Sequence, residues 1–210
     1  MDFQPMHYVY KSSGNPEAMT LLLLHGTGGN EHDLIPLATY FGSDINILSL
    51  RGNTNENGMP RFFKRLAMGV FDEEDLEFRT HEMVTFIKEL AEKEKFDATK
   101  IIALGYSNGA NIAGATLFLH PNFLAGAILF RPMLPFHHQE IQFNFNKTPI
   151  FLSSGNQDTM VSSGEIENYV EALNFAGFDV TNFTINTGHN LSQLDLDLAV
   201  EWFQIKNLVN

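Results

Sequence analysis

Short apolar runs alternate with longer amphipathic segments along the chain. The runs in the middle of the chain are apolar throughout rather than at every second position, which is typical of strands covered on both faces. This alternation predicts a mostly parallel sheet with crossover helices on both of its faces. The predicted strands are Thr20–Leu24, Ile45–Leu50, Lys100–Leu104, Ala125–Phe130, Pro149–Ser153 and Asp179–Ile185, with an antiparallel first strand at His7–Lys11.

Helical periodicity is clearest between Asp72 and Phe96, where the apolar positions form one stripe and Glu and Lys occupy the other face. Four acidic residues crowd the first turn of this segment, where carboxylates interact favourably with the helix dipole. Ser162 and Glu165 have the spacing of a capping box at the start of another helix. The predicted helices are Leu34–Phe41, Asp72–Phe96, Ser107–Leu119, Ser162–Ala176 and Leu194–Lys206.

Two stretches without a regular pattern, Arg51–Phe71 and Arg131–Thr148, are long for loops. Each follows the carboxyl end of a predicted strand, where open α/β sheets bind their ligands. We expect their apolar side chains to line a substrate pocket; the alternative for each is that it only anchors its loop to the core. The candidates are Phe62, Phe63, Leu66, Met68 and Phe71 in the first stretch, and Met133, Leu134 and Phe136 in the second.

Composition limits the class of protein. The chain has 210 residues, of which 44% are hydrophobic and 18% charged, and this suits one folded domain over residues 1–210. The absence of cysteine excludes a disulfide framework, a thiolate nucleophile and cysteine-ligated zinc. A net charge of −12 disfavours binding to nucleic acid or to an anionic membrane. We see no signal peptide and no apolar run long enough to cross a bilayer, so we expect a cytoplasmic protein.

Residues 105–109 read Gly-Tyr-Ser-Asn-Gly, which matches the nucleophile elbow G-x-S-x-G. The pattern alone is weak, but here an apolar strand leads into it and a helical segment leads out. A sharp turn between strand and helix points the serine hydroxyl into the crevice, and the two glycines leave room for the close approach. The alternative is an ordinary strand-to-helix turn capped by a serine. We interpret Ser107 as a nucleophile.

A serine nucleophile needs a base and an acid that orients it, and in this kind of fold the chain order is Ser, then Asp or Glu, then His. Asp158 follows a predicted strand and a glycine turn, and His189 follows the last predicted strand and Gly188. We therefore predict that Asp158 and His189 complete a triad with Ser107.

Other residues compete for these roles. We interpret His120 as a partner of a helix C-terminus, and His137 and His138 as loop residues for which no third or fourth metal ligand is apparent. Glu165 and Glu167 are expected on a helix surface, and Asp195 and Asp197 at the start of the last helix. No metal or other cofactor is predicted.

The loop after the first parallel strand, residues 24–29, reads Leu-His-Gly-Thr-Gly-Gly. We expect the backbone N–H of Thr27 to pair with that of Asn108 as an oxyanion hole. The loop lacks the lysine of a phosphate-binding loop, and His25 is expected to brace it. Arg61 could bind a substrate carboxylate or form an internal pair with Glu31 or another acid; we favour the internal pair.

With these residues the chain resembles the phospholipase/carboxylesterase family of small α/β-hydrolases, which includes acyl-protein thioesterases. Residues 51–53, 56–63 and 71–76 resemble, more specifically, hydrolases encoded in bacterial quinone-resistance operons. The resemblance implies a single α/β-hydrolase domain without a cofactor, often dimeric, with Ser107, Asp158 and His189 as triad and Thr27 and Asn108 as oxyanion donors. One departure is that the elbow has Tyr106 and Asn108 where the thioesterase branch usually has Phe and Gln.

These observations predict a serine hydrolase that cleaves short-to-medium acyl carboxylic esters through an acyl-enzyme. The length leaves no room for a lid domain, so the two long loops must form the pocket. Thioester, lysophospholipid or amide substrates remain alternatives, as does a noncatalytic binding protein, although the intact triad disfavours the last. Dehalogenase or lyase chemistry on this fold is disfavoured because it commonly places Asp at the elbow.

Overall fold

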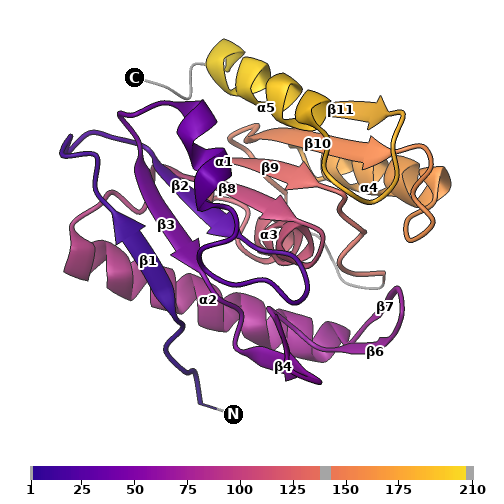
Figure 1. Ribbon diagram of the computed structural model, residues 1–210, viewed down its shortest axis with the longest axis horizontal. Coiled ribbons are helices and arrows are strands. Elements are labelled where there is room, and N and C mark those ends of the chain that lie inside the picture. Colours follow the sequence, from indigo (N-terminus) through magenta and orange to yellow (C-terminus); the bar gives the residue numbers. More distant parts are fainter. Residues whose placement is uncertain (1, 138–142, 207–210) are drawn as a thin grey trace.

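The computed structural model describes residues 2–137 and 143–206. Its centre is a sheet of seven strands in the order β1-β3-β2-β8-β9-β10-β11 (Figure 1). Strand β1 pairs antiparallel with β3, and the other neighbours pair parallel. The strands are β1 (Tyr8–Lys11), β2 (Thr20–Leu24), β3 (Asn46–Leu50), β8 (Ile101–Tyr106), β9 (Gly126–Phe130), β10 (Pro149–Gly155) and β11 (Asp179–Ile185).

All seven predicted strands are confirmed, including the antiparallel first one. Two of them are longer at the carboxyl end than predicted, because β8 continues to Tyr106 and β10 to Gly155. The extra residues still pair with their neighbours: Tyr106 lies opposite Phe130, and Gly155 opposite Ile185. These pairs bring the ends of four strands to one edge of the sheet, where the elbow and the two triad loops begin.

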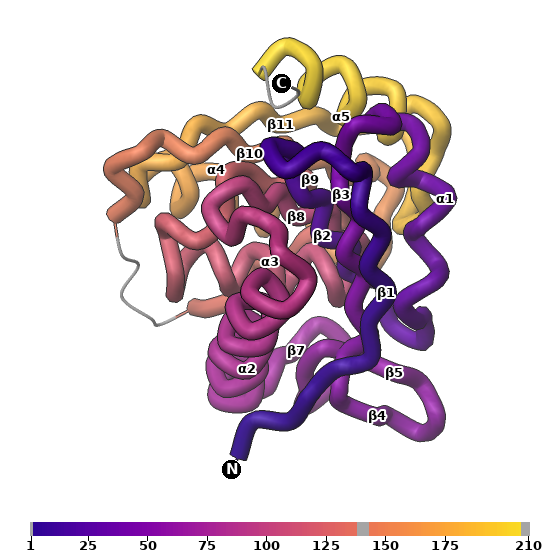
Figure 2. The backbone as a smooth tube through the Cα atoms, turned by 90° about the vertical axis from the view of Figure 1, so that its left-hand side faces the viewer, coloured from indigo at the N-terminus to yellow at the C-terminus, as the bar shows by residue number. Residues whose placement is uncertain are grey.

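Helices cover both faces of the sheet (Figure 2). The first face carries α2, α3 and α4, and the second carries α1, the 3₁₀ helix η1 and α5. Helix α2 starts after Asp72, whose side chain accepts a hydrogen bond from the N–H of Asp75, and the capping box predicted at Ser162 is present. The bounds are α1 (Ile35–Ala38), η1 (Thr39–Phe41), α2 (Glu73–Glu94), α3 (Asn108–Leu119), α4 (Ser163–Phe175) and α5 (Gln193–Ile205).

Alternate residues of each central strand pack against opposite helical layers. In β2, Leu22 and Leu24 belong to the core under α2, α3 and α4, whereas Leu21 and Leu23 belong to the core under α1 and α5. Both faces of the strand are therefore buried, which explains why its sequence is apolar throughout. Within the described residues, none of the helices has the length and apolar character needed to span a bilayer.

Residues 51–71, predicted to lack regular structure, contain two short hairpins. Strands β4 (Thr54–Glu56) and β5 (Met59–Arg61) form one, and β6 (Arg65–Ala67) and β7 (Val70–Phe71) the other. The first turn contains Asn57 and Gly58, both with positive φ, and an Asn-Gly turn is the common two-residue hairpin connection. Two- and three-residue strands are too short to give a readable pattern in the sequence.

The second long stretch, Arg131–Thr148, contains no helix or strand among its described residues, and residues 138–142 lie outside the described part.

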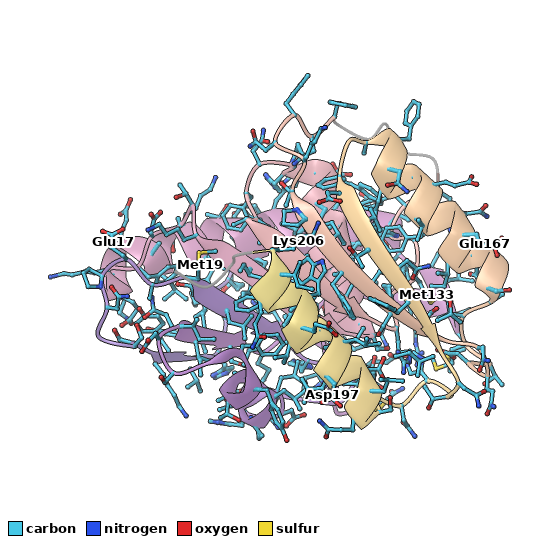
Figure 3. All side chains as sticks on the ribbon, turned by 90° about the horizontal axis from the view of Figure 1, so that it is seen from above. Glu17, Met19, Met133, Glu167, Asp197 and Lys206 are labelled. Atoms are coloured by element: carbon cyan, nitrogen blue, oxygen red, sulfur yellow. The ribbon has the colours of Figure 1, made fainter. Side chains whose placement is uncertain are left out.

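The acidic residues expected on the surface are placed as predicted. Glu167 on α4 and Asp197 on α5 are exposed (Figure 3), and Glu165 serves the capping box of α4.

Candidate active site

Ser107 lies at the turn between β8 and α3 with φ 50° and ψ −111°. A positive φ is unfavourable for a residue with a side chain, and such strain is commonly found at functional positions. The backbone N–H of Ser107 donates to the carbonyl of Phe130 on the neighbouring strand (2.9 Å), and its carbonyl accepts from Asn111 (2.9 Å). The turn is therefore fixed on both sides, and it holds the hydroxyl above the carboxyl edge of the sheet.

The two glycines of the elbow are required by close backbone contacts. A Cβ at Gly105 would lie 2.5 Å from the carbonyl oxygen of Gly109, and a Cβ at Gly109 would overlap the carbonyl of Leu24 in β2. Helix α3 thus begins in direct contact with the ends of two strands. This confirms the steric reason for which the glycines were expected.

The three predicted triad residues meet in space. The Nε2 atom of His189 lies 2.9 Å from the Oγ of Ser107, and its Nδ1 lies 2.7 Å from Oδ2 of Asp158. The other carboxylate oxygen of Asp158 accepts from the N–H of Met160 (2.8 Å). The Asp158 side chain is 2% exposed and that of His189 is 21% exposed, so the carboxylate is shielded while the imidazole still faces the pocket.

Arg131, which the sequence indicated only as the start of a loop, holds the backbone next to His189. Its Nε donates to the carbonyl of Gly188 (3.0 Å) and its Nη2 to that of Asn190 (3.1 Å). The same guanidinium forms a two-pronged pair with Asp195 at 2.7 and 2.8 Å, and the Arg131 side chain is fully buried. Burial alone would raise the pKa of Asp195, but hydrogen bonds from Arg131, Ser153 and Ser192 outweigh it and hold the pKa below its usual value.

Tyr106 completes this support, because its hydroxyl donates to the carbonyl of His189 itself (3.2 Å). Three consecutive carbonyls, those of Gly188, His189 and Asn190, are therefore fixed by side chains. A Phe at position 106, usual in the thioesterase branch, would lack this hydroxyl. The only signals in the sequence were that Tyr106 immediately precedes the serine and that Arg131 directly follows a buried strand.

The predicted oxyanion donors flank the serine. Both Thr27 and Asn108 line the pocket that contains Ser107 and His189. Within the part of the chain that the structure describes, neither backbone N–H donates a hydrogen bond to another residue. Asn108 is the first residue of α3, so its N–H also belongs to the positive end of the helix dipole.

His25 has the bracing role predicted for it. Its Nε2 accepts from the N–H of Gly52 (3.1 Å), which links the loop after β2 to the loop after β3. Accepting this bond requires an unprotonated nitrogen, and burial lowers the pKa of His25 accordingly.

Arg61 forms an internal ion pair, the alternative that we favoured, and its partner is Glu56 at 3.4 Å. Glu31, the acid named in the prediction, pairs with Arg51 instead. The hairpin β4–β5 brings Glu56 close to Arg61, and this proximity could not be foreseen for a segment predicted as irregular. Arg61 also donates to the hydroxyl of Thr27 (2.7 Å) and so steadies the loop that carries one oxyanion donor.

The pocket walls differ in part from the expectation. Phe71 and Met133 line the pocket as predicted, together with Met68. Phe62 and Phe63, 1% and 0% exposed, belong to the core under α2, α3 and α4, and Leu66 is 72% exposed and lines a neighbouring cavity instead. The prediction that these three line the pocket is wrong, because the hairpins direct the Phe pair inward and Leu66 outward. The pocket residues missed from the sequence are Arg65, Gly69, Asn111, Arg131 and Met160.

Among the described histidines, His189 alone lines the pocket of Ser107. His120 contacts His81 (2.9 Å), and burial together with that neighbour lowers the pKa of His120 to about 4. His120 lies at the C-cap of α3, the helix end at which it was predicted, but the lowered pKa disfavours the protonated form that would interact with the helix dipole. His137 is described and His138 lies outside the described residues; among those described, no three His, Asp or Glu side chains gather as a metal site would require.

Comparison with known proteins places the chain in a family. The model of the Phospholipase/Carboxylesterase family matches residues 6–207. The chain belongs to this family. The Bacillus subtilis protein named "Putative hydrolase MhqD" is 43% identical over 199 residues, which cover 95% of this chain and 98% of that protein.

Solved structures of related proteins agree. The Bacillus cereus carboxylesterase is 46% identical with a TM-score of 0.92, covering 95% of this chain and 94% of the other. The structure of YahD with malic acid is 32% identical with a TM-score of 0.89, covering 95% and 98%. The fold is thus the α/β-hydrolase fold of the phospholipase/carboxylesterase family, and the protein is a hydrolase of the carboxylesterase type.

Proposed function

We propose that the protein is a serine esterase that hydrolyses small carboxylic esters through an acyl-enzyme on Ser107. The observation that supports this most directly is the continuous hydrogen-bonded chain from Ser107 through His189 to Asp158, with distances of 2.9 and 2.7 Å at a strained elbow. Three polar residues that met by chance would not be expected to coincide with a strained elbow, a buried carboxylate and a fixed histidine loop.

In the proposed reaction, Ser107 Oγ attacks the ester carbonyl while His189 Nε2 accepts its proton. The N–H groups of Thr27 and Asn108 stabilise the oxyanion of the tetrahedral intermediate. His189 then returns the proton to the leaving alcohol, and the acyl group stays on Ser107. Water, deprotonated by His189, releases the acid in the second half of the cycle. Asp158 holds the imidazole in the required tautomer throughout.

Ser107→Ala tests the nucleophile. We expect it to abolish labelling by a fluorophosphonate probe and to lower the turnover of p-nitrophenyl butyrate by a factor on the order of 10⁶, as in other triads. Ser43→Ala, at an exposed position on another loop, is the matched control and should label normally. Labelling that persists at another serine in the Ser107→Ala protein would overturn the assignment.

The size of the pocket supports short acyl groups. The cavity beside Ser107 measures about 30 Å³, room for one or two water molecules, and its apolar wall consists of Met68, Phe71, Met133 and Met160. Each methylene that fits adds about 0.8 kcal/mol of burial, and the gain stops where the pocket ends. We propose an optimum of roughly two to six acyl carbons on this reasoning.

A series of p-nitrophenyl esters from acetate to palmitate measures this optimum. A value of kcat/KM that keeps rising through the long chains would contradict the short-chain proposal and favour thioesterase or lysophospholipase activity. Malic acid in the YahD structure makes small carboxylic acids a ligand class to test on this chain as well.

A further inference from the structure

A second cavity of about 500 Å³ adjoins the pocket of Ser107. It is formed by the β4–β5 hairpin and the start of β6. Asp72, which precedes α2, and Arg79 in α2 also line it. Arg61 and Arg65 line both this cavity and the Ser107 pocket, so they form the wall between the two. A substrate group that reaches this wall from Ser107 meets side chains that also line the larger cavity.

Four cationic side chains line the cavity in a protein whose net charge is −12. Its lining contains Arg61, Lys64, Arg65 and Arg79 against the carboxylates of Glu56 and Asp72.

The two guanidinium groups of the dividing wall have one carboxylate between them as an ion-pair partner, while Asp72, which also lines the cavity, caps α2 by accepting from the N–H of Asp75. Lys64 is balanced by Asp75 (3.3 Å) and Arg79 by Glu82 (2.8 Å). Arg61 and Arg65, by contrast, share the single carboxylate of Glu56, at 3.4 and 2.9 Å.

Both wall residues have an Nη2 that donates to nothing in the described part of the chain, and Arg65 is the more exposed of the two. Arg61 is 4% exposed at its side chain and donates to the carbonyl of Phe63 and the hydroxyl of Thr27. Arg65 is 19% exposed; its Nε donates to Glu56, its Nη1 to the sulfur of Met68, and its Nη2 to nothing in the described part of the chain. A thioether is a weak acceptor, and a guanidinium edge is shaped to bind a carboxylate through two parallel hydrogen bonds.

The neighbouring charges also favour an added anion. Burial lowers the pKa of Arg61, and the positive charge of Arg65 lowers it further. A carboxylate placed beside Arg65 would provide the second negative charge that these two guanidinium groups lack.

We propose that this cavity binds a carboxylate carried by the substrate, with Arg65 as its ligand, so that the preferred substrates are small esters bearing a free acid group. The inference rests on the proposed esterase function of Ser107. It adds that selectivity comes from charge as well as from the apolar wall. The carboxylate can belong to the acyl or to the alcohol part of the ester, and the experiment separates these two cases.

Matched esters test the proposal. The first pair is 4-carboxyphenyl butyrate and 4-carbamoylphenyl butyrate, which place a charged or neutral group of the same shape on the leaving alcohol. The second pair is the monophenyl ester of adipic acid and the phenyl ester of adipic acid monoamide. These two place the charged or neutral group on the acyl part. We expect kcat/KM, normalised to the rate with hydroxide, to favour the carboxylate about tenfold in one of the pairs, which identifies the side.

Two variants decide whether Arg65 is responsible. In Arg65→Met the ratio of kcat/KM for the carboxylate ester to kcat/KM for its matched amide should fall to about one. Lys64→Met removes a charge from the same cavity and should keep most of the preference, because Lys64 is already paired with Asp75. Absence of a preference in the unmodified protein, or an equal loss in both variants, would overturn the proposal, since the Arg61–Glu56–Arg65 group would then only join the hairpins.

A binding measurement separates this proposal from the proposed function. Glutarate and glutaramide are titrated calorimetrically into the Ser107→Ala protein, which needs no turnover. We expect binding of glutarate only, and its loss in Ser107→Ala/Arg65→Met. If neutral esters are cleaved through Ser107 but glutarate does not bind, the carboxylate subsite is wrong and the esterase function stands. If glutarate binds while no ester is cleaved, the esterase function is wrong.

Discussion

The two residues that flank Ser107 connect it to two regions that are built differently. Tyr106 reaches the histidine loop, where three carbonyls, a buried ion pair and a capping box fix the backbone. Asn108 reaches the hairpins, since its Oδ1 accepts from the N–H of Phe62 (2.8 Å). Beyond that anchor the second hairpin is exposed, with Leu66 at 72% and Met68 at 66%.

The difference matches what each region is proposed to do. Proton transfer depends steeply on distance and alignment, so the imidazole benefits from a backbone that cannot shift. A wall that accommodates substrates can be less constrained, and Met side chains adapt their shape readily. The elbow thus joins a rigid region, which we propose for the chemistry, to a more exposed region, which we propose for binding.

Asp158→Asn breaks the rigid region at its most sensitive point and should have the largest effect. An amide in place of the carboxylate favours the wrong imidazole tautomer, and we expect kcat to fall by about 10⁴. The exposed Asp197→Asn on α5 is the matched control and should keep its activity. Steady-state kinetics measure both. Near-normal turnover in Asp158→Asn would show that the acid is elsewhere.

Arg131→Met tests whether the rigid region needs its buried guanidinium. The change leaves Asp195 buried and unpaired, and we expect a loss of about 3–5 kcal/mol in the free energy of unfolding, measured in urea. Arg131→Met/Asp195→Asn removes the unpaired charge and should recover much of that stability. Its kcat should stay low, because the carbonyls of Gly188 and Asn190 still lack their donor. A double variant with full kcat would show that Arg131 does not position His189.

Phe63→Ala and Met133→Ala sharpen the comparison on the hairpin side. Phe63 is fully buried, so its truncation should cost about 3–5 kcal/mol of stability. Met133 is only partly buried and lines the pocket, so Met133→Ala should cost less and should extend the range of accepted acyl chains. Unfolding in urea and the ester series measure the two effects. A shifted chain-length optimum in Phe63→Ala at unchanged stability would restore Phe63 to the pocket wall.

Tyr106→Phe should have the smallest effect. It removes one hydrogen bond, to the carbonyl of His189, worth about 0.5–1.5 kcal/mol, and leaves the two bonds from Arg131 in place. We expect kcat to fall a few-fold. Tyr8→Phe removes a hydroxyl that donates to Glu94, the last residue of α2, and is the control. A loss as large as that of Arg131→Met would mean that Tyr106 is the main support of the loop.

The sequence by itself determined which apolar runs form strands, the helices between them and the strand–turn–helix context of the elbow. These features are local: a buried strand is apolar throughout, a capping box has a fixed spacing, and G-x-S-x-G leaves a sterically defined turn. Asp158 and His189 were also within reach, because each follows a strand and a glycine at the sheet edge that carries Ser107. Their position in the chain sufficed to bring them together.

Only the tertiary structure decided what surrounds these residues. Arg131 and Asp195 are 64 residues apart, and no pattern along the chain indicates that their side chains meet under the histidine loop. The inward direction of Phe62 and Phe63 depends on hairpins whose strands are too short to leave a periodic signal. The sharing of the Glu56 carboxylate by Arg61 and Arg65 arises from the same hairpins. Contacts of this kind depend on which surfaces pack together, and packing is a property of the folded chain.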